Sequence, residues 1–95
     1  MVTELAWGYA WQGTALDRKT KSLLSLVMLA ALGRFQELGI YTKGAIAAGV
    51  TVDEIKEALT HVTVYCGTPT GRLAFLAAHE ALVVAGALPG PASPA

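Results

Sequence analysis

The chain has 95 residues, enough for one domain, and its seven basic and seven acidic residues cancel, so no charge excess would steer it toward nucleic acid or an anionic membrane. Hydrophobic residues make up 54% of the sequence and charged residues 15%, against about 45–50% and about 25% in ordinary soluble domains. Because a chain this short buries only a modest part of its surface alone, the surplus apolar surface predicts an obligate homo-oligomer, with neither nucleic acid nor a membrane as a partner.

Residues 1–13 contain both tryptophans, Trp7 and Trp11, four positions apart, as on one face of a helix. The simpler interpretation is a short helix whose indoles pack on the core or on a neighbouring subunit. The functional alternative is an aromatic wall of a substrate pocket. Glu4 lies near the start, and no basic region precedes a long apolar segment, which argues against a signal peptide. We therefore expect a cytoplasmic protein, and the single cysteine, Cys66, agrees with this expectation.

The next helix is predicted from Arg18 to about Leu32, with Asp17 as its N-cap and Gly33 as its stop. Its basic first turn has the wrong sign for the helix dipole, which is destabilising unless those side chains pair with acids or with another subunit. The longest apolar run, Leu23 to Leu32, spans ten residues, whereas a bilayer crossing needs about 20. The run therefore predicts a buried core helix.

A third helix is predicted from Phe35 to Ala48. It contains Gly39 and Gly44, each of which costs about 1 kcal/mol against alanine. Two such glycines indicate close contact between helices or room for a ligand. Glu37 and Tyr41 are four positions apart and so share a face of this helix.

The stretch from Gly49 to Leu82 predicts two helices joined by a very short, rigid turn. Thr51 is a good N-cap, and Glu54 follows three residues later, so the two form a capping box. An apolar stripe follows at spacings of three and four, formed by Val52, Ile55, Leu59, Val62 and Cys66.

Gly67 is predicted to end the first of these helices. Thr68 and Pro69 start the second, with the threonine as cap and the proline at the first helical position. His61 and Arg72 lie on either side of this hinge. We therefore expect a small polar pocket where the two helices meet.

The last helix is predicted to run to about Val84 and to end at Gly86, which gives a domain of residues 1–86. Residues 87–95 are rich in proline and alanine and have no periodicity, which predicts a flexible tail. The sequence shows no internal repeat and no strand-like alternation. The predicted fold class is all-α.

The order of these signals resembles the carboxymuconolactone decarboxylase family over about residues 5–85. The segments that carry the resemblance are Trp7-Gly8 and Trp11, Leu16 to Leu23, Ala31 to Arg34, Lys43 to Ala45, Gly49 to Thr51 with Glu54-Ile55, His61, and Tyr65 to Pro69. The resemblance implies a small orthogonal helical bundle of the alkylhydroperoxidase-like type, assembled as a homo-trimer or a homo-hexamer. It also implies a small-molecule substrate, in one of two branches.

The alkylhydroperoxidase-like branch carries a Cys-x-x-Cys and a histidine, which would fall at Arg34, Glu37 and Tyr41. None of the three is present. Cys66 stands alone on the apolar stripe, where we expect a small buried hydrophobe. Because a dithiol cycle needs a resolving thiol, we expect no peroxidase activity.

The decarboxylase branch is similar at His61 and at Glu37. This chain departs from it at Tyr41, where the branch has a histidine, and at Arg72, where it usually has an asparagine. The branch implies decarboxylation of a small carboxylated lactone or related cyclic compound in the catabolism of aromatic compounds, without cofactor or metal. The two departures leave the substrate open.

Such a reaction must hold the leaving carboxylate, stabilise a dienolate and deliver a proton to carbon. We expect His61 to donate the proton, Tyr41 to donate a hydrogen bond to the oxyanion and Glu37 to orient Tyr41. We assign substrate binding to Arg72, because its planar fork suits a carboxylate, and to the aromatic wall of Trp7 and Trp11. We also assign Glu57 to the binding site, where it would raise the pKa of His61 or fix its tautomer.

Three alternatives stay open. The first is a family member recruited to another acid–base reaction such as isomerisation, dehydration or cyclisation. The others are a small-ligand-binding protein without catalysis and a purely structural oligomer.

Overall fold

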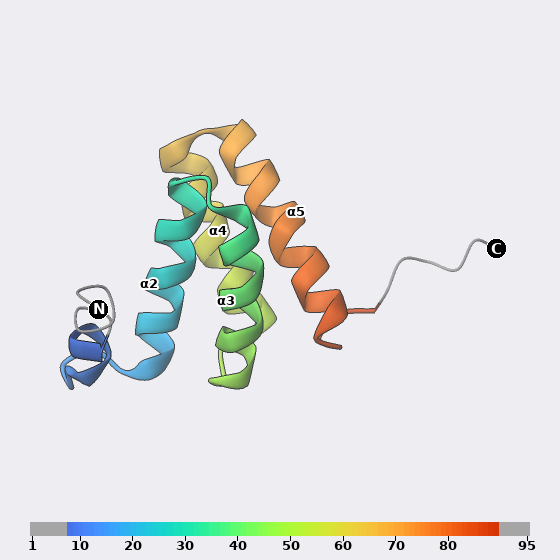
Figure 1. The fold of residues 1–95 in the computed structure, drawn as a ribbon. Helices are drawn as coiled ribbons and strands as arrows, with labels where there is room; N and C mark the ends of the chain where they lie inside the picture. Colours follow the sequence, from blue (N-terminus) through green and yellow to red (C-terminus); the bar gives the residue numbers. More distant parts are fainter. Residues whose placement is uncertain (1–7, 90–95) are drawn as a thin grey trace.

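The computed structural model describes residues 8–89, and four helices in this range pack into one bundle (Figure 1). They are α2 (Arg18–Ala31), α3 (Phe35–Ala47), α4 (Val52–Cys66) and α5 (Thr68–Val84). Residues 8–12 are also helical, and no strand occurs within residues 8–89. The all-α prediction is confirmed. None of the described helices is both long enough and apolar enough to cross a membrane.

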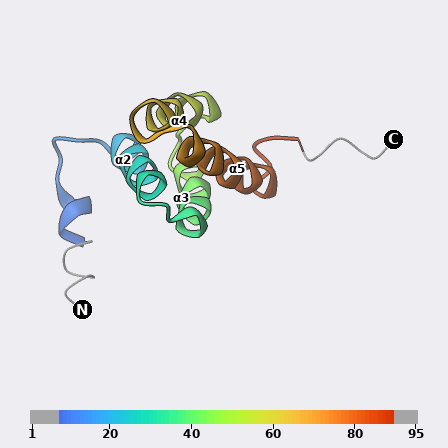
Figure 2. The ribbon, with the colours of Figure 1, turned by 90° about the horizontal axis from the view of Figure 1, so that it is seen from above.

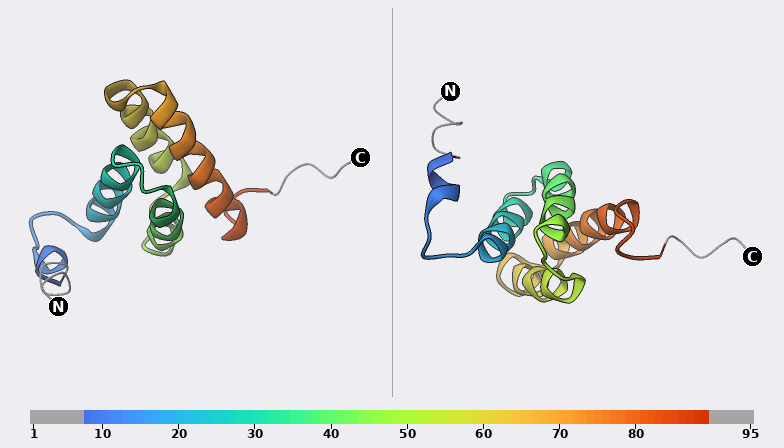
Figure 3. Two further views of the ribbon diagram at one scale, coloured as in Figure 1. Left: turned by 45° about the horizontal axis from the view of Figure 1, so that its top comes forward. Right: turned by 90° about the horizontal axis from the view of Figure 1, so that it is seen from below.

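The bundle is built from two helix pairs, each with a short connection. α2 and α3 lie side by side and are joined by three residues, whereas α4 and α5 are joined by one (Figures 1 and 2). α5 packs against both α3 and α4, and α2 packs against α3 and α4. Figure 3 shows α5 inclined to the other helices rather than parallel to them.

The core forms where the apolar faces of the four helices meet. Leu26, Leu38, Ile55 and Leu59 are almost fully buried, and each such side chain contributes about 1.5–3 kcal/mol. On α5 the buried positions are occupied by small residues, Ala74, Ala78 and Ala81, together with Leu82. These alanines let α5 approach both of its neighbours closely.

The predicted stripe on α4 is confirmed at Ile55, Leu59 and Val62, which are buried, and at Val52, which is half-buried. The prediction is wrong at Cys66, which is exposed. Cys66 is the last residue of α4 and lies at the mouth of a cavity between this helix and α2, so its side chain stays open to solvent.

Side-chain caps begin two of the helices as predicted. Asp17 accepts a hydrogen bond of 2.7 Å from the Thr20 amide, and Thr51 and Glu54 form the reciprocal capping box at 3.1 and 2.8 Å. Glu54 also pairs with Lys19 at 3.2 Å. Part of the basic first turn of α2 is therefore compensated by an acid at the start of α4.

Gly67 alone connects α4 to α5, and its φ of 101° lies in the region that favours glycine. The predicted role of Thr68 as a cap is wrong. Thr68 is the first residue of α5, Gly67 occupies the cap position and no side chain caps this helix. Because Gly67 alone separates the two helices, Thr68 falls inside α5 rather than at its cap position.

The two glycines of α3 have different surroundings. A β-carbon on Gly39 would lie 3.9 Å from the β-carbon of Ala81, which is ordinary van der Waals contact with α5. A β-carbon on Gly44 would meet nothing within 4 Å. Gly39 therefore marks the predicted helix contact, and Gly44 leaves open space.

The packed domain extends beyond the predicted boundary at residue 86. The amides of Ala87 and Leu88 both donate to the Leu82 carbonyl, and the two side chains pack against the core. The tail predicted from residue 87 therefore cannot begin before Pro89. Residues 90–95 lie outside the described part of the chain.

The apolar run of α2 is only partly buried, so its prediction as a buried core helix is corrected. Leu26 and Ala30 face the core, but Leu24, Met28 and Leu32 are 42%, 56% and 73% exposed. These three residues are spaced four apart and form one apolar face of α2 that points away from the core. We call it the outer face of α2.

Candidate functional site

Three of the predicted site residues that the structure describes line two cavities at opposite ends of α2, whereas Glu37, Glu57 and Arg72 line neither of them. One cavity contains His61 and the other contains Tyr41 and Trp11. Trp7 lies outside the described residues.

The His61 cavity has a volume of about 310 Å³ and lies between the last turns of α2 and α4. Its walls are Val27, Met28 and Ala31 from α2, and Val62, Tyr65 and Cys66 beside His61 from α4. The lining is therefore mostly apolar, in contrast to the polar pocket expected here. Arg72 is exposed on α5 and does not line this cavity.

The His61 ring stacks on the ring of Tyr65, one helical turn later. The ring centroids are 6.2 Å apart, and the planes differ by only 9°. His61 itself is exposed. Within residues 8–89 no hydrogen bond or ion pair joins Glu57 to His61, although the two lie one turn apart, so the expected partnership is not seen.

The Tyr41 cavity is smaller, about 160 Å³, and is enclosed by the first turns of α2 and the last turns of α3. Trp11 forms one wall. Arg18 and Ser22 approach from α2, and Gly44 provides the open space noted above. The remaining walls are Ala45 and Ala48.

Glu37 does not orient Tyr41 in this structure. Its carboxylate pairs with Arg34 at 3.4 Å on the exposed side of α3. The same two positions would hold the paired cysteines of the alkylhydroperoxidase-like branch. In this chain they carry a surface ion pair instead.

The two cavities are too far apart for one small molecule to occupy both within one chain. Arg18 and Met28 line different cavities and are ten positions apart on α2, which is about 15 Å along the helix axis. His61 and Tyr41 therefore lie at separate places on an isolated chain.

Three lining residues were not singled out as site residues from the sequence, namely Arg18, Ser22 and Tyr65. Arg18 and Ser22 are four apart on one helix, and Tyr65 follows His61 at the same spacing, so each pair shares a face. These spacings were visible in the sequence. Which residues lie opposite each pair depends on how α3 and α4 pack against α2.

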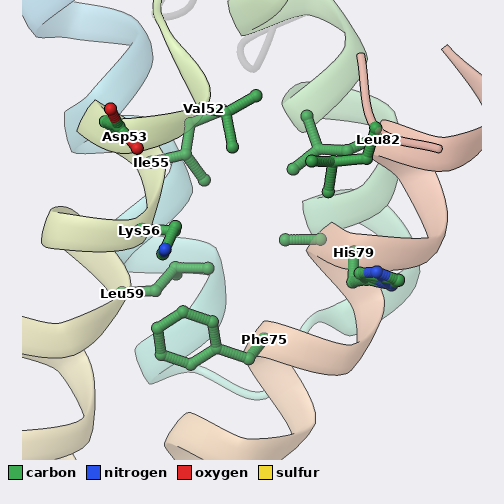
Figure 4. A pocket seen from close by; sticks show the side chains of 10 residues that line it. Val52, Asp53, Ile55, Lys56, Leu59, Phe75, His79 and Leu82 are labelled. Carbon is green, nitrogen blue, oxygen red and sulfur yellow. The ribbon is translucent and has the colours of Figure 1, made fainter. Parts of the chain in front are cut away.

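A third cavity, of about 410 Å³, lies between α4 and α5 (Figure 4). Val52, Ile55 and Leu59 from α4 and Phe75 and Leu82 from α5 give it apolar walls. Its polar lining residues are Asp53, Lys56 and His79. The described residues hold no group of three or more His, Cys, Asp or Glu side chains that could bind a metal.

Comparison with known proteins places this arrangement in context. The sequence model of the carboxymuconolactone decarboxylase family matches residues 1–80. The chain is 51% identical over 70 residues to nitrosuccinic acid decarboxylase npaB of Metarhizium robertsii, and 38% identical over 79 residues to 4-carboxymuconolactone decarboxylase of Acinetobacter baylyi. These alignments cover 74% and 83% of this chain but only 49% and 59% of the two relatives. The chain thus spans about half the length of these relatives, and no solved structure matches it significantly.

Proposed function

The chain belongs to the carboxymuconolactone decarboxylase family, and from this premise we propose that it is a cofactor-independent decarboxylase of small carboxylated compounds. The observation that carries the proposal is its similarity to two proteins that are both named as decarboxylases. The peroxidase chemistry of the other branch is disfavoured, because Arg34 and Glu37 stand where that branch has its cysteines.

The two named substrates share a chemical property that makes a cofactor unnecessary. When the carbon–carbon bond to the carboxylate breaks, carbon dioxide leaves and an electron pair remains on the substrate. A lactone carbonyl reached through a double bond can accept that pair in one substrate, and a nitro group can accept it in the other. The protein then has to hold the substrate, stabilise the resulting anion and return a proton to carbon.

His61 is proposed as the proton donor in this reaction. Its ring lies at an apolar cavity, and an imidazole changes protonation state near neutral pH. Apolar walls such as Val27 and Met28 stabilise a departing carboxylate less than water does. The same walls accept neutral carbon dioxide readily, so the lining favours transfer of the negative charge from the carboxylate to the delocalised substrate anion.

The other predicted residues keep their roles as parts of the proposal. Tyr41 donates a hydrogen bond to the oxyanion, Trp11 and Trp7 form an aromatic wall, and Arg72 binds a substrate oxygen. Glu57 supports His61, and Glu37, which pairs with Arg34 in the isolated chain, would have to leave that ion pair to support Tyr41.

Because His61 and Tyr41 lie at different cavities, we further propose that the site is completed in a cytoplasmic homo-trimer or homo-hexamer. The exposed outer face of α2 supports this proposal, since Met28 belongs both to that face and to the wall of the His61 cavity. A neighbouring copy packed on the outer face would also close the cavity.

A second candidate is another acid–base reaction on a related acid, such as isomerisation, dehydration or cyclisation. The observation that favours it is Tyr41, which replaces a histidine of the decarboxylase branch. A phenol is a weaker acid than an imidazolium, so it would stabilise an oxyanion by a hydrogen bond rather than transfer a proton.

Release of carbon dioxide from nitrosuccinate and from 4-carboxymuconolactone tests the proposal directly. The wild type should act on at least one of them, and His61→Ala should be slower by about 10²-fold, the scale of a general acid. His79→Ala is the matched control, since it removes a histidine that lines a different cavity. A folded wild type that releases carbon dioxide from neither acid would contradict the function, and an unimpaired His61→Ala variant would contradict the role of His61.

A further inference from the structure

The Tyr41 cavity combines a cation with two hydroxyl groups that have no partner in the described part of the chain. The Arg18 guanidinium takes part in no ion pair or hydrogen bond within residues 8–89, and neither does the Tyr41 hydroxyl. A guanidinium offers several donors in a planar fork, and a phenol offers one more. The cavity is thus lined by hydrogen-bond donors that no acceptor within residues 8–89 satisfies.

Ser22 strengthens this conclusion because it is 91% buried, with only 9% of its surface exposed. A buried hydroxyl normally finds a hydrogen-bond partner. The Ser22 hydroxyl has none among the described residues, yet no buried polar side-chain atom there is both unpaired and sealed from solvent. The hydroxyl is therefore open to the cavity that the residue lines, and a ligand can reach it.

The electrostatic surroundings select an anion. Arg18 is the first residue of α2, and the first turn of this helix contains no acidic residue. The positive end of the helix dipole adds to the guanidinium charge at this point. Among residues 8–89, no acidic side chain lines the cavity. Asp17 lines the neighbouring cavity, and its carboxylate accepts from the Thr20 amide.

We propose that Arg18 and Ser22 bind the carboxylate group that the substrate retains through the reaction, beside Tyr41, whose hydroxyl serves the oxyanion. The choice of a carboxylate rests on the proposed function, and the site itself is a property of this chain. Its volume of about 160 Å³ is below the roughly 300–1,000 Å³ of pockets that enclose whole drug-sized ligands, so it suits one end of a small molecule.

The bound group is the retained carboxylate rather than the one that leaves. An ion pair with Arg18 stabilises a carboxylate in the ground state, and that stabilisation is lost when the group becomes neutral carbon dioxide. Binding the leaving carboxylate at this site would therefore raise the barrier, whereas binding the other carboxylate anchors the substrate at no such cost. Arg18 thus selects substrates that carry a second carboxylate.

Succinate is the probe, because it has two carboxylates and no electron sink and so is not turned over. It is titrated into the full chain at low ionic strength and followed by two-dimensional NMR of isotope-labelled protein. Arg18→Gln should raise Kd by about tenfold or more, the loss expected for hydrogen bonds to a charged group. Arg18→Lys should give an intermediate Kd, since it keeps the charge and loses the planar fork.

Lys43→Gln is the charge-matched control. Lys43 lies on α3 two residues after Tyr41, but it lines a different cavity, facing α5. Its removal should change Kd by less than about twofold, because an exposed charge that does not touch the ligand interacts with it only weakly through water. Thermal melts establish that each variant is folded.

Three outcomes would overturn the proposal. These are no succinate binding to the wild type at millimolar concentration, equal weakening by Lys43→Gln and Arg18→Gln, and equal binding of the neutral analogue succinamide. Turnover separates this inference from the proposed function. Arg18-dependent succinate binding without carbon dioxide release from either acid would reject only the function. Turnover with a KM unaffected by Arg18→Gln would reject only this site.

Discussion

A β-carbon on Gly71 of α5 would lie 2.6 Å from the β-carbon and 2.8 Å from the α-carbon of Thr63 on α4. Gly71 is buried one turn after the Gly67 connection, so the two helices touch through backbone and β-carbon atoms at this point. No change of side-chain rotamer can remove such a clash.

Gly71→Ala should therefore destabilise the protein, by about 2 kcal/mol. Overpacking typically costs about 1–3 kcal/mol, and the better helix propensity of alanine returns at most about 1 kcal/mol. Urea unfolding measures the difference. Gly39→Ala is the control, because its β-carbon would lie 3.9 Å from the nearest atom, and it should be neutral or slightly stabilising. Equal stability of the two variants would show that α4 and α5 are further apart than described.

The capping box at the start of α4 should contribute measurably to stability. Thr51→Ala removes the hydroxyl that accepts from the Glu54 amide, and the loss of such a cap costs about 1 kcal/mol. Thermal unfolding should show a lower Tm for Thr51→Ala, by about 4–8 °C. Thr60→Ala, an exposed threonine in the middle of the same helix, should show no comparable loss.

Stability should also depend on the protonation of Glu54. The hydrogen bond from the Thr51 amide, with a further contribution from Lys19, holds the pKa of this carboxyl below its ordinary value. The unfolded chain therefore binds the proton more readily. The stabilisation is present above the unfolded pKa and is lost as the pH falls through the lower folded pKa.

Glu54→Gln should accordingly reduce Tm near neutral pH, and the difference from the wild type should shrink in acid. Glu80→Gln, at an exposed glutamate of α5, is the charge-matched control. If the Tm of Glu54→Gln stays below that of the wild type by a constant amount down to strongly acidic pH, the loss of stability comes from packing rather than from the ionised carboxylate.

Association should depend on the outer face of α2. Light scattering at micromolar concentration should show a trimer or a larger assembly, and Leu24→Glu should shift it toward the monomer by placing a charge on the apolar face. Thr60→Glu adds the same charge to an exposed polar position on α4 and should leave the assembly intact. A well-folded wild-type monomer would refute the oligomer outright.

The stack of His61 on Tyr65 should position the imidazole for proton transfer. An aromatic pair contributes about 0.5–1.5 kcal/mol, so Tyr65→Ala should lower kcat by roughly 2–10-fold. Tyr65→Phe keeps the ring and should restore kcat, while the NMR signals of His61 should shift only in the alanine variant. If both variants lose activity equally, the hydroxyl matters and the stack does not.

The helix ends were predictable because their signals are local. Asp17, Thr51 and Gly67 each act on the backbone of their own turn, and the structure confirms all three. The exposure of Cys66 was not predictable in this way. A stripe on α4 predicts which residues share a face, but how far along α4 the cover from α5 extends depends on the angle between the helices.

The candidate site shows the same limit. Sequence spacing placed Tyr41 on a defined face of its helix and His61 close to the hinge, and both do line cavities. Which residues face them across each cavity is set by the packing of α2 against α3 and α4. For that reason Arg18 and Tyr65 emerge from the structure rather than from the sequence.

The ion pair between Lys19 and Glu54 distinguishes the two ends of the α2–α4 pair. It joins the beginning of α2 to the beginning of α4, while the His61 cavity lies at the far ends of the same two helices. The pair of helices therefore has a charged contact at one end and an apolar opening at the other, so a ligand for His61 enters at the end that no ion pair within residues 8–89 closes.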